Sequence, residues 1–403
     1  MSSAPIPPAP MSNESLQAAD ARPAAPKAPI YRHYHRIAWL AVALALCVIV
    51  FGAFVRLSHA GLSCPDWPTC YGRATWPSVT AEVNHPTALD VRPLEVHKAW
   101  REQVHRHAAA VLGTLVLILA LLAARRRRFG VAQVLAAAAL IAVGIPLYMR
   151  GMHEAAIACA VLGESILLLA ALRWSNDDLS RASTLTLMLI VFQALLGMWT
   201  VTLLLKPVVV MGHLLGGMST FAMLTWMAWR ATGSPVRIAG VPVMRRWLIG
   251  AVAVVGIQIA LGGWVSANYA ALACGNDFPT CVGQWLPPTD FREGFVLWRG
   301  IGVDYEGGVL DGASRIAIQL AHRGMAVVVF LYLLTLAFKL IRTPGLWLAG
   351  VVLGLLTLAQ VGLGIGNVVM GLPLWVATLH NAGAALLLFL LVGLLARLRP
   401  PTD

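Results

Sequence analysis

Charged side chains are scarce in this sequence. Only 12% of the 403 residues are Asp, Glu, Lys or Arg, whereas a soluble domain has roughly 25%. Acidic residues are the rarer kind, with 18 against 30 basic ones, and the formal net charge is +12. The basic residues lie between long apolar runs instead of gathering with aromatic residues on a polar domain, so their number does not indicate nucleic-acid binding. Apolar residues make up 59% of the chain, which indicates that lipid, not water, is its main solvent.

The N-terminal segment also lacks a feature. Residues 1–30 are rich in Ala, Pro and Ser and contain no apolar region followed by a cleavage site. This composition predicts a disordered tail over residues 1–35 and no cleaved signal peptide. The first apolar run would then direct insertion into the membrane.

What the chain does contain is a series of apolar runs, each close to the roughly 20 residues that a membrane-spanning helix needs. The ten predicted spans are 37–57, 104–124, 131–149, 153–173, 184–205, 208–229, 247–267, 314–338, 345–369 and 373–396. They predict an all-α polytopic transmembrane bundle.

The short loops between these runs carry a strong charge bias that predicts the orientation. Basic residues favour the cytoplasmic side of a membrane. The basic residues that fall on one side are Arg125, Arg126, Arg127, Arg128, Arg230, Arg237, Arg245, Arg246, Lys339 and Arg342. We therefore place that side and both termini in the cytoplasm, and the two long loops at 58–103 and 268–313 outside.

Those two loops contain an internal repeat. The segment 51–72 aligns with 261–283, and the alignment pairs the cysteines of the first loop with those of the second. These cysteines are Cys64, Cys70, Cys274 and Cys281. An oxidising outer compartment permits one disulfide in each loop. A redox-active dithiol that passes electrons to a cofactor is the alternative.

The repeat extends to histidines in the apolar runs. The segment 104–109 matches 321–326, which pairs His105 with His322, and 193–217 matches 360–384, which pairs His213 with His380. The first half has 50 more residues between its two histidines, enough for one helical hairpin, and we assign this surplus to 131–173. We expect two parallel four-helix halves, residues 36–235 and 236–403, with the hairpin added to the first.

All four histidines fall near the outer ends of their spans. Imidazole is costly in lipid and tends to mark a functional site. Two facing histidines suit a six-coordinate haem iron, so we expect one haem in each half. A hydrogen bond to a neighbouring helix carbonyl is the alternative for any single histidine, and zinc would require three or four close ligands.

Charged residues beside the histidines add two expectations. Arg106 and Arg323 follow His105 and His322 directly, where they could pair with haem propionates or anchor the helix ends. Glu102 lies one helical turn before His105, whereas the second half has Gln319 there. This difference suggests chemistry in the first half and electron transfer in the second, although a glutamate near a helix N-terminus is also favoured by the helix dipole.

Taken together, these motifs resemble the haem A synthase family. The resemblance rests on Glu102, His105 and Arg106 at the start of one helix, on the CPDWPTC loop and on the GMWTVTLLLKP run before His213. It covers most of residues 36–397. It implies an enzyme that oxidises the C8 methyl of haem O, through an alcohol and a geminal diol, to the formyl group of the haem A that haem-copper terminal oxidases use.

The resemblance also implies roles for the histidines. His322 and His380 would bind a resident haem b, whereas His105 and His213 would flank the haem O substrate, with Glu102 needed for turnover. The extra pair at 131–173 departs from the simplest family members. It contains the intramembrane acid Glu164, for which we expect a hydrogen bond inside the bundle.

Partners and rival functions follow from the same features. The implied partners are haem O, the lipid bilayer of a bacterial inner membrane, a haem O synthase and an electron donor or acceptor. Both a monomer and a homo-oligomer are compatible with the sequence. A dihaem b-type cytochrome that relays electrons from quinol would use the same histidines but gives no reason for the difference between Glu102 and Gln319. A transporter built from parallel repeats would favour broken helices and midplane sites instead.

Overall fold

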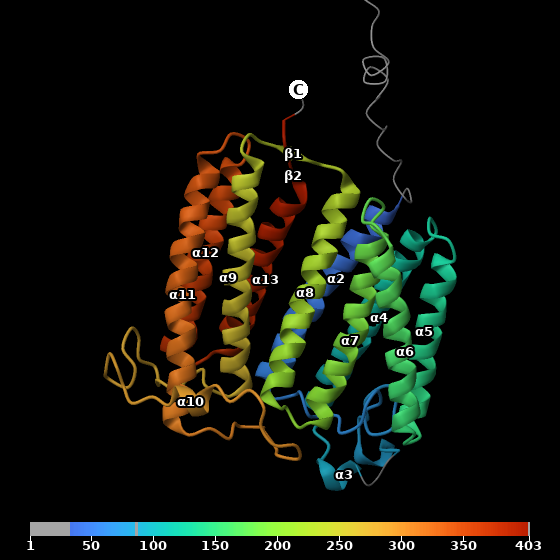
Figure 1. The fold of residues 1–403 in the computed structure, drawn as a ribbon. Helices are drawn as coiled ribbons and strands as arrows, with labels where there is room; N and C mark the ends of the chain where they lie inside the picture. The colour runs from blue at the N-terminus through green and yellow to red at the C-terminus, as the bar shows by residue number, and fades with distance from the viewer. Residues whose placement is uncertain (1–32, 85–87, 402–403) are drawn as a thin grey trace, which may run out of the picture.

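Long helices dominate the computed structural model, which describes residues 33–84 and 88–401. Within this part of the chain, ten helices are long and apolar enough to cross a membrane, which confirms the predicted all-α transmembrane fold (Figure 1). They are α2 (Tyr34–Leu57), α4 (Val96–Ala124), α5 (Gly130–Met149), α6 (His153–Arg173), α7 (Ser180–Thr202), α8 (Pro207–Thr232), α9 (Val241–Ala267), α11 (Gly312–Ile341), α12 (Trp347–Val369) and α13 (Leu374–Arg397).

Short elements complete the fold. The outer loops contain η1 (Thr80–Glu82), α3 (Ala88–Val91) and α10 (Phe291–Gly294). At the opposite end, β1 (Val236–Arg237) pairs in parallel with β2 (Leu398–Arg399). Almost all of the tail predicted over residues 1–35 lies outside the described residues.

The helices form two sets of four that repeat the same contacts. In the first set α2 packs against α4 and α8, and α7 packs against α4 and α8. In the second set α9 packs against α11 and α13, and α12 packs against α11 and α13. The sets meet through α8, which contacts α9 and α13, and through α2, which contacts α13. Helices α5 and α6 pair with each other at the edge of the first set, beside α4 and α7 (Figure 1).

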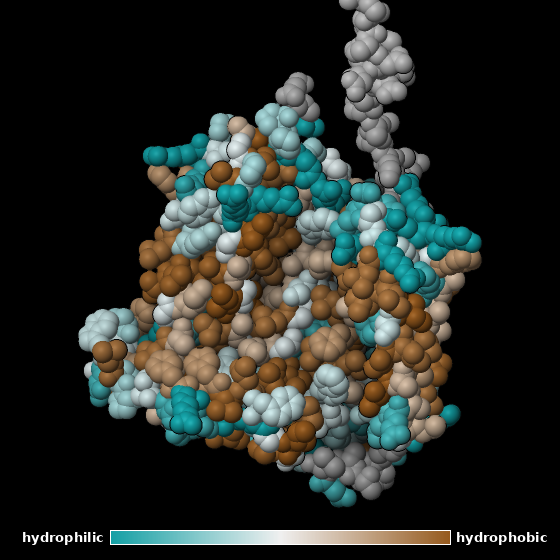
Figure 2. Space-filling model, in the orientation of Figure 1, coloured by the Kyte–Doolittle hydropathy of each residue, from teal (hydrophilic) through white to brown (hydrophobic). Residues whose placement is uncertain are grey.

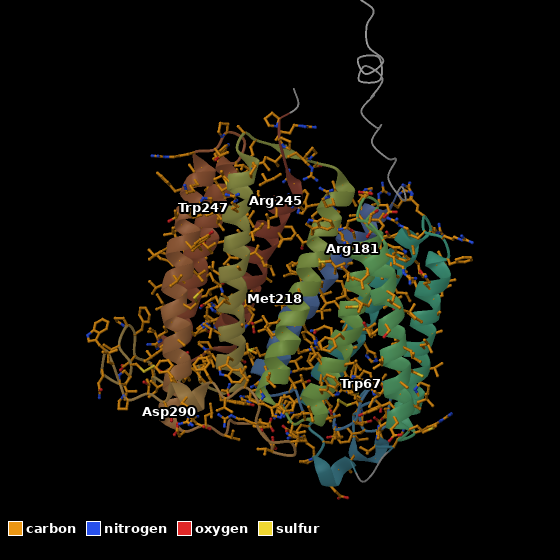
Figure 3. All side chains as sticks on the ribbon, in the orientation of Figure 1. Trp67, Arg181, Met218, Arg245, Trp247 and Asp290 are labelled. Atoms are coloured by element: carbon orange, nitrogen blue, oxygen red, sulfur yellow. A yellow bond between two sulfur atoms is a disulfide. The ribbon has the colours of Figure 1, made fainter. Side chains whose placement is uncertain are left out.

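The surface is divided into bands. On the face shown in Figure 2, a broad apolar belt covers the helices, and hydrophilic residues gather at both ends. Arg181 and Arg245 lie toward the end where α2 begins and α13 ends, whereas Trp67 and Asp290 lie at the end that carries the long loops (Figure 3). A belt of this kind is expected where lipid chains, not water, cover the helices.

Several helix ends differ from the prediction, and the contacts explain two of these differences. Helix α4 begins at Val96 and not at 104, because polar residues of its first turns pack against the outer loop: Gln103 is buried and donates hydrogen bonds to the carbonyls of Ala74 and Pro68. A span predicted from apolar runs alone leaves out polar residues of this kind, even where they are helical. Helix α7 ends at Thr202 instead of 205, where the chain turns through Leu204 and Leu205 with positive φ.

Glycine allows α11 and α12 to pack closely. A Cβ atom at Gly350 would lie 2.6 Å from the carbonyl oxygen of Ala337 and 2.7 Å from the backbone nitrogen of Ile341. In a membrane, where lipid is as apolar as the side chains, close backbone contact of this kind is a main source of helix association.

We expect Gly350→Val to lower the free energy of unfolding by about 1–3 kcal/mol, because the added methyl groups would separate the two backbones. Thermal unfolding of the purified protein in detergent measures this. Gly362→Val on the same helix is the control, since a Cβ there meets nothing within 4 Å. Equal stability of the two variants would contradict the close packing.

Candidate functional site

One large cavity brings the four predicted histidines together. Its volume is about 2090 Å³, and its lining residues include His105, His213, His322 and His380. They lie nine, six, ten and six residues after the first residues of α4, α8, α11 and α13, which corresponds to about 9–15 Å along the helix axes. The predicted span placed His105 at the start of its helix. The structure places it nine residues into α4, at a depth similar to that of the other three histidines.

Each imidazole is packed against a glycine of a neighbouring helix. A Cβ at Gly52 of α2 would lie 2.6 Å from Cε1 of His105, and one at Gly262 of α9 would lie 3.1 Å from Cε1 of His322. The later histidines repeat the arrangement, because a Cβ at Gly197 or Gly364 would lie 3.1 Å from Cε1 of His213 or His380. The glycines let the Cε1 edge of each ring approach the adjacent backbone closely, and a larger side chain there would crowd the ring.

Two glutamines hold α8 and α13, the helices that carry His213 and His380, in the same way. Gln193 of α7 donates to the backbone carbonyl of His213, and Gln360 of α12 donates to that of His380 at 2.9 Å. The sequence repeat contained these glutamines and glycines at constant offsets, so the signal for their role was present. Only the structure shows that they contact the histidines.

The imidazoles themselves are left with free nitrogen atoms. Nδ1 of His105, His213 and His380 is buried and has no hydrogen-bond partner. A buried polar atom without a partner is costly and calls for an explanation such as a missing ligand. Among residues 33–84 and 88–401, no three His, Cys, Asp or Glu side chains form a cluster that could hold a metal ion. Pairs of histidines in a large cavity fit the two axial positions of a haem iron.

Gln258 distinguishes the second half. Its Nε2 lies 3.2 Å from Nδ1 and 3.4 Å from Nε2 of the His322 ring, and it donates to the carbonyl oxygen of the same residue at 3.2 Å. The repeat places Val48 at the equivalent position of α2. A hydrogen bond to the second ring nitrogen commonly fixes the orientation of a ligating histidine, so His322 is the most constrained of the four rings.

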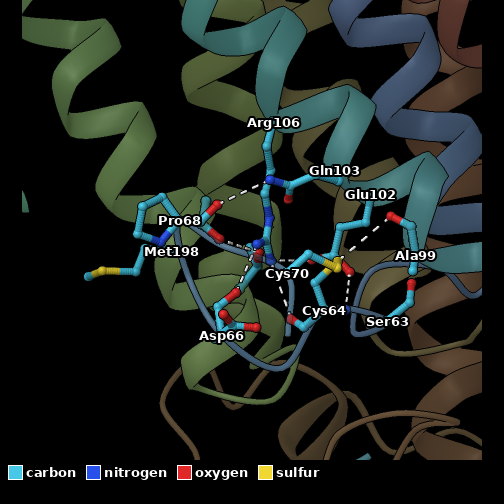
Figure 4. Close-up of polar contacts among 12 residues, drawn as sticks. Ser63, Cys64, Asp66, Pro68, Cys70, Ala99, Glu102, Gln103, Arg106 and Met198 are labelled. Atoms are coloured by element: carbon cyan, nitrogen blue, oxygen red, sulfur yellow. Dashed lines mark hydrogen bonds and ion pairs between the residues drawn. A yellow bond between two sulfur atoms is a disulfide. The ribbon is translucent and has the colours of Figure 1, made fainter. Parts of the chain in front are cut away.

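The acid predicted beside His105 is held by the first disulfide loop (Figure 4). Glu102 lines the cavity, is buried, and accepts a hydrogen bond from the backbone N–H of Cys64 at 2.9 Å. Its other oxygen pairs with Nη2 of Arg106 at 2.6 Å. Glu102 lies six residues into α4, beyond the first turn where the helix dipole acts. The dipole therefore does not account for an acid at this position.

Arg106 also donates hydrogen bonds from its guanidinium group to carbonyls of the first disulfide loop. It donates to the carbonyls of Asp66 at 2.8 Å, Thr69 at 2.7 Å and Cys64 at 3.3 Å. Arg106 still lines the cavity. The spacing of charged residues did not reveal that its main partners are loop carbonyls.

The second half repeats this arrangement without the carboxylate. Arg323 donates to the carbonyls of Thr280 and Asp277, both at 2.9 Å. Gln319 donates to the carbonyl of Ala271 at 3.2 Å. Among the described residues no carboxylate lies within 4.0 Å of the Arg323 guanidinium, and its Nε is buried without a hydrogen-bond partner. The cation beside the second histidine pair therefore has no ion-pair partner in the described part of the chain, and the Asp277 carboxylate attracts it only from a greater distance.

The loop cysteines form the two predicted disulfides, Cys64 with Cys70 and Cys274 with Cys281. The first lies beside a buried tyrosine, Tyr71, whose hydroxyl donates to the carbonyls of Arg92 and Pro93. Burial raises the pKa of Tyr71 to about 12, so its hydroxyl stays protonated at neutral pH. Cys64, through its N–H, places the first disulfide next to Glu102.

Sequence reasoning missed one cation that joins the halves. Arg56, at the end of α2, donates to the hydroxyl of Tyr269 at 3.1 Å and to the carbonyl of Ser266 at 2.8 Å, both from the second half. All three line the cavity. The repeat alignment places Ser266 opposite Arg56, so this unequal pair was the signal that could have drawn attention to it.

The fold and the site together define a polytopic membrane protein whose two helix sets each contribute one pair of half-buried histidines to a shared cavity. The chain belongs to the COX15-CtaA family of cytochrome oxidase assembly proteins, whose model matches residues 35–152 and 155–392. The match includes nearly all of the inserted pair α5 and α6.

Curated relatives agree with this family. The chain is 35% identical over 364 residues to the heme A synthase of Shewanella oneidensis, which covers 89% of this chain and 95% of the relative. It is also 36% identical over 154 residues to the heme A synthase of Rhodospirillum centenum, which covers 38% of each chain. A third match, to the heme A synthase of Caulobacter sp. K31, is 29% identical over 220 residues and covers 52% of this chain and 60% of the relative.

The contact between Gly262 and His322 leads to a prediction. We expect Gly262→Val to weaken haem binding in the second half by about tenfold, because the side chain would displace the ring. Haem retained by the purified protein, measured by visible absorption, is the readout. Gly256→Val on the same helix should retain haem, since a Cβ there meets nothing within 4 Å. Full haem retention by Gly262→Val would refute the packing argument.

Proposed function

We propose that this protein is a haem A synthase, a membrane enzyme of haem biosynthesis that converts haem O to the haem A used by haem-copper terminal oxidases. The observation that supports this most directly is the pairing of two equivalent histidine pairs in one cavity with a buried carboxylate, Glu102, beside only one of them. A catalytic acid or base is needed where chemistry occurs, but not where a cofactor only carries electrons.

The reaction we propose is the oxidation of the C8 methyl group of haem O to a formyl group. The methyl carbon gains one oxygen atom and loses four electrons to an electron acceptor of the membrane, by way of an alcohol and a geminal diol that releases water. Protons leave the substrate with these electrons. The protein therefore needs a group near the methyl carbon that can accept and release protons.

Glu102 fits this requirement. It lies one turn before His105 on α4, so both side chains face the same cavity. The Cys64 N–H and Arg106 hold its carboxylate in place from the side of the loop. A positioned carboxylate in a desolvated site is a suitable general base. In this proposal Glu102 accepts the protons released at the carbon, while His105 and His213 flank the substrate.

The second histidine pair suits a resident haem b, which when bound supplies one-electron redox chemistry. His322 and His380 would be its axial ligands. Haem propionates are anionic, and Arg323 lacks a carboxylate partner, whereas Arg106 is paired with Glu102. A site with an unneutralised cation holds an anionic cofactor more firmly. This charge difference supports a retained haem in the second half and an exchangeable one in the first, with Arg106 and Arg323 as propionate contacts.

The protein is an integral membrane protein, and we propose that it lies in the bacterial inner membrane with both termini in the cytoplasm. The short loops rich in arginine support this orientation. Both disulfides lie at the opposite end, which suits an oxidising compartment. Haem O synthase and an electron donor or acceptor would be partners in the same membrane.

A dihaem cytochrome that relays electrons from quinol is the second candidate function. The shared cavity favours it, because both histidine pairs line the same space. It gives no role to Glu102 or to the contrast with Gln319. Haem A in membranes of cells that express the protein, and its absence without the protein, would separate the two functions.

We expect Glu102→Gln to reduce haem A formation by about a hundredfold, the usual minimum for loss of a general base, with haem b content unchanged. Reversed-phase analysis of the haems in membranes measures both. Gln103→Ala is the matched control, because it removes hydrogen bonds to the same loop and leaves the carboxylate. Haem A formation at the wild-type rate in Glu102→Gln would rule out the catalytic role.

The two histidine pairs should respond differently to alanine substitution. We expect His322→Ala and His380→Ala to lose the resident haem, because each removes an axial ligand. His105→Ala and His213→Ala should retain that haem and fail to convert haem O. Extraction of pigment from the four purified variants decides the matter, and equal haem loss from both pairs would overturn the proposed division of roles.

A further inference from the structure

The inserted helix α6 presents one face to the cavity that contains the histidines. Ile157, Val161, Glu164 and Leu168 all line that cavity. They lie at intervals of four, three and four residues, which places them on one face of a helix. This α6 face extends over the twelve residues 157–168, or about 16 Å along the helix axis.

Protein atoms do not fill the space in front of the α6 face. Ile157 is 61% exposed, Val161 58% and Leu168 42%, and all three line the cavity. Across the space on α4, Gly113 also lines the cavity, and a Cβ atom there would meet nothing within 4 Å. An apolar groove therefore leads from the first histidine pair to α6.

The groove contains one polar group without a partner. Oε1 of Glu164 is buried and makes no hydrogen bond within the described part of the chain, contrary to the internal bond expected from the sequence. A buried carboxyl oxygen without a donor is costly. A plain hydrocarbon chain in the groove would leave it unsatisfied, whereas a chain that carries a hydroxyl group could donate to it.

The groove belongs to the half that we assign to the substrate. The first disulfide loop rests on the inserted hairpin: Trp67 contacts Tyr148 edge to face at 6.2 Å between ring centroids, and Tyr148 contacts His153 at 5.2 Å. The second half has no inserted hairpin. Its counterpart of Trp67 is Phe278, which is 45% exposed. Both the groove and Glu102 are thus confined to the half with His105 and His213.

We propose that this groove binds the long hydroxylated isoprenoid side chain that distinguishes haem O from protohaem. The inference rests on the proposed function, because it takes haem O as the substrate of the first histidine pair. A side chain of the haem bound against α6 would orient the macrocycle. Two axial histidines fix the iron but leave the macrocycle free to rotate about the axis between them. A bound side chain removes that freedom and determines which methyl group lies beside Glu102.

Hydrophobic burial alone cannot supply this selectivity, because the chain would otherwise lie in lipid of similar polarity. Shape and the Glu164 hydrogen bond must therefore provide it. A lipid acyl chain is the competing occupant of the same space. The two occupants differ in their effect on haem binding, since only the isoprenoid chain is part of the ligand.

The test compares neighbouring residues of α6. Val161→Trp fills the groove, whereas Leu162→Trp adds the same bulk at a residue that is 56% exposed and does not line the cavity. The purified protein, with its resident haem, is titrated with haem O and with protohaem, and binding is followed by absorption. We expect Val161→Trp to weaken haem O binding by about tenfold and to leave protohaem binding unchanged. Leu162→Trp should change neither.

A second pair of variants tests the polar contact. Glu164→Leu should weaken haem O binding by several-fold with no effect on protohaem, whereas Glu164→Gln should bind haem O as the wild type does, because its amide oxygen still accepts a hydrogen bond. Wild-type affinity in Glu164→Leu would remove Glu164 from the proposal.

Two results would overturn the groove assignment. Equal weakening of haem O and protohaem by Val161→Trp would mean that the substitution disturbs the macrocycle, and no weakening of either would mean that the groove holds lipid. The proposed function is judged separately, by haem A formation. If the protein binds haem O selectively but forms no haem A, the groove assignment stands and the proposed enzyme activity is refuted. If haem A forms but Val161→Trp weakens haem O and protohaem binding equally, the activity stands and the groove assignment is refuted.

Discussion

The arrangement of the whole bundle depends on how imidazole can be accommodated inside a membrane. Polar groups in lipid need partners, yet buried Nδ1 atoms of His105, His213 and His380 have none within the protein. The helices have adapted to these rings: a glycine faces each one, and two glutamines hold the later histidine helices by their backbone carbonyls. Such a structure makes sense if the rings bind a ligand that the fold is built to receive.

Duplication explains why the two sites are alike, and the departures from it explain how they can differ. The second half has Gln258 at His322, where the first has Val48, and it leaves Arg323 without an acidic partner. The first half has Glu102, which neutralises Arg106. One site therefore has a constrained histidine and an arginine without an ion-pair partner, which would suit the retention that we propose. The other has an acid and no net charge from this ion pair, which suit turnover and release.

The sequence was sufficient for features that depend on apolar length and on the repeat. The spans, the four histidines and the disulfides follow from those patterns, because lipid permits few alternatives to a helix. It was insufficient where the outcome depends on which loop approaches a helix. Spacing placed Glu102 on the face of His105, but not beside the Cys64 N–H, and it could not show that Arg106 would donate to loop carbonyls. Those contacts join residues about 40 positions apart.

The inserted pair α5 and α6 fits this division between the halves. A pair of helices added only for stability could lie against either half with equal effect. This pair lies against α4 and α7, contacts the disulfide loop that holds Glu102, and encloses an unfilled groove continuous with His105 and His213. A retained cofactor needs only its axial ligands and a counter-charge, whereas a substrate must also be oriented at each turnover. The half that we assign to the substrate is the half that has the additional wall.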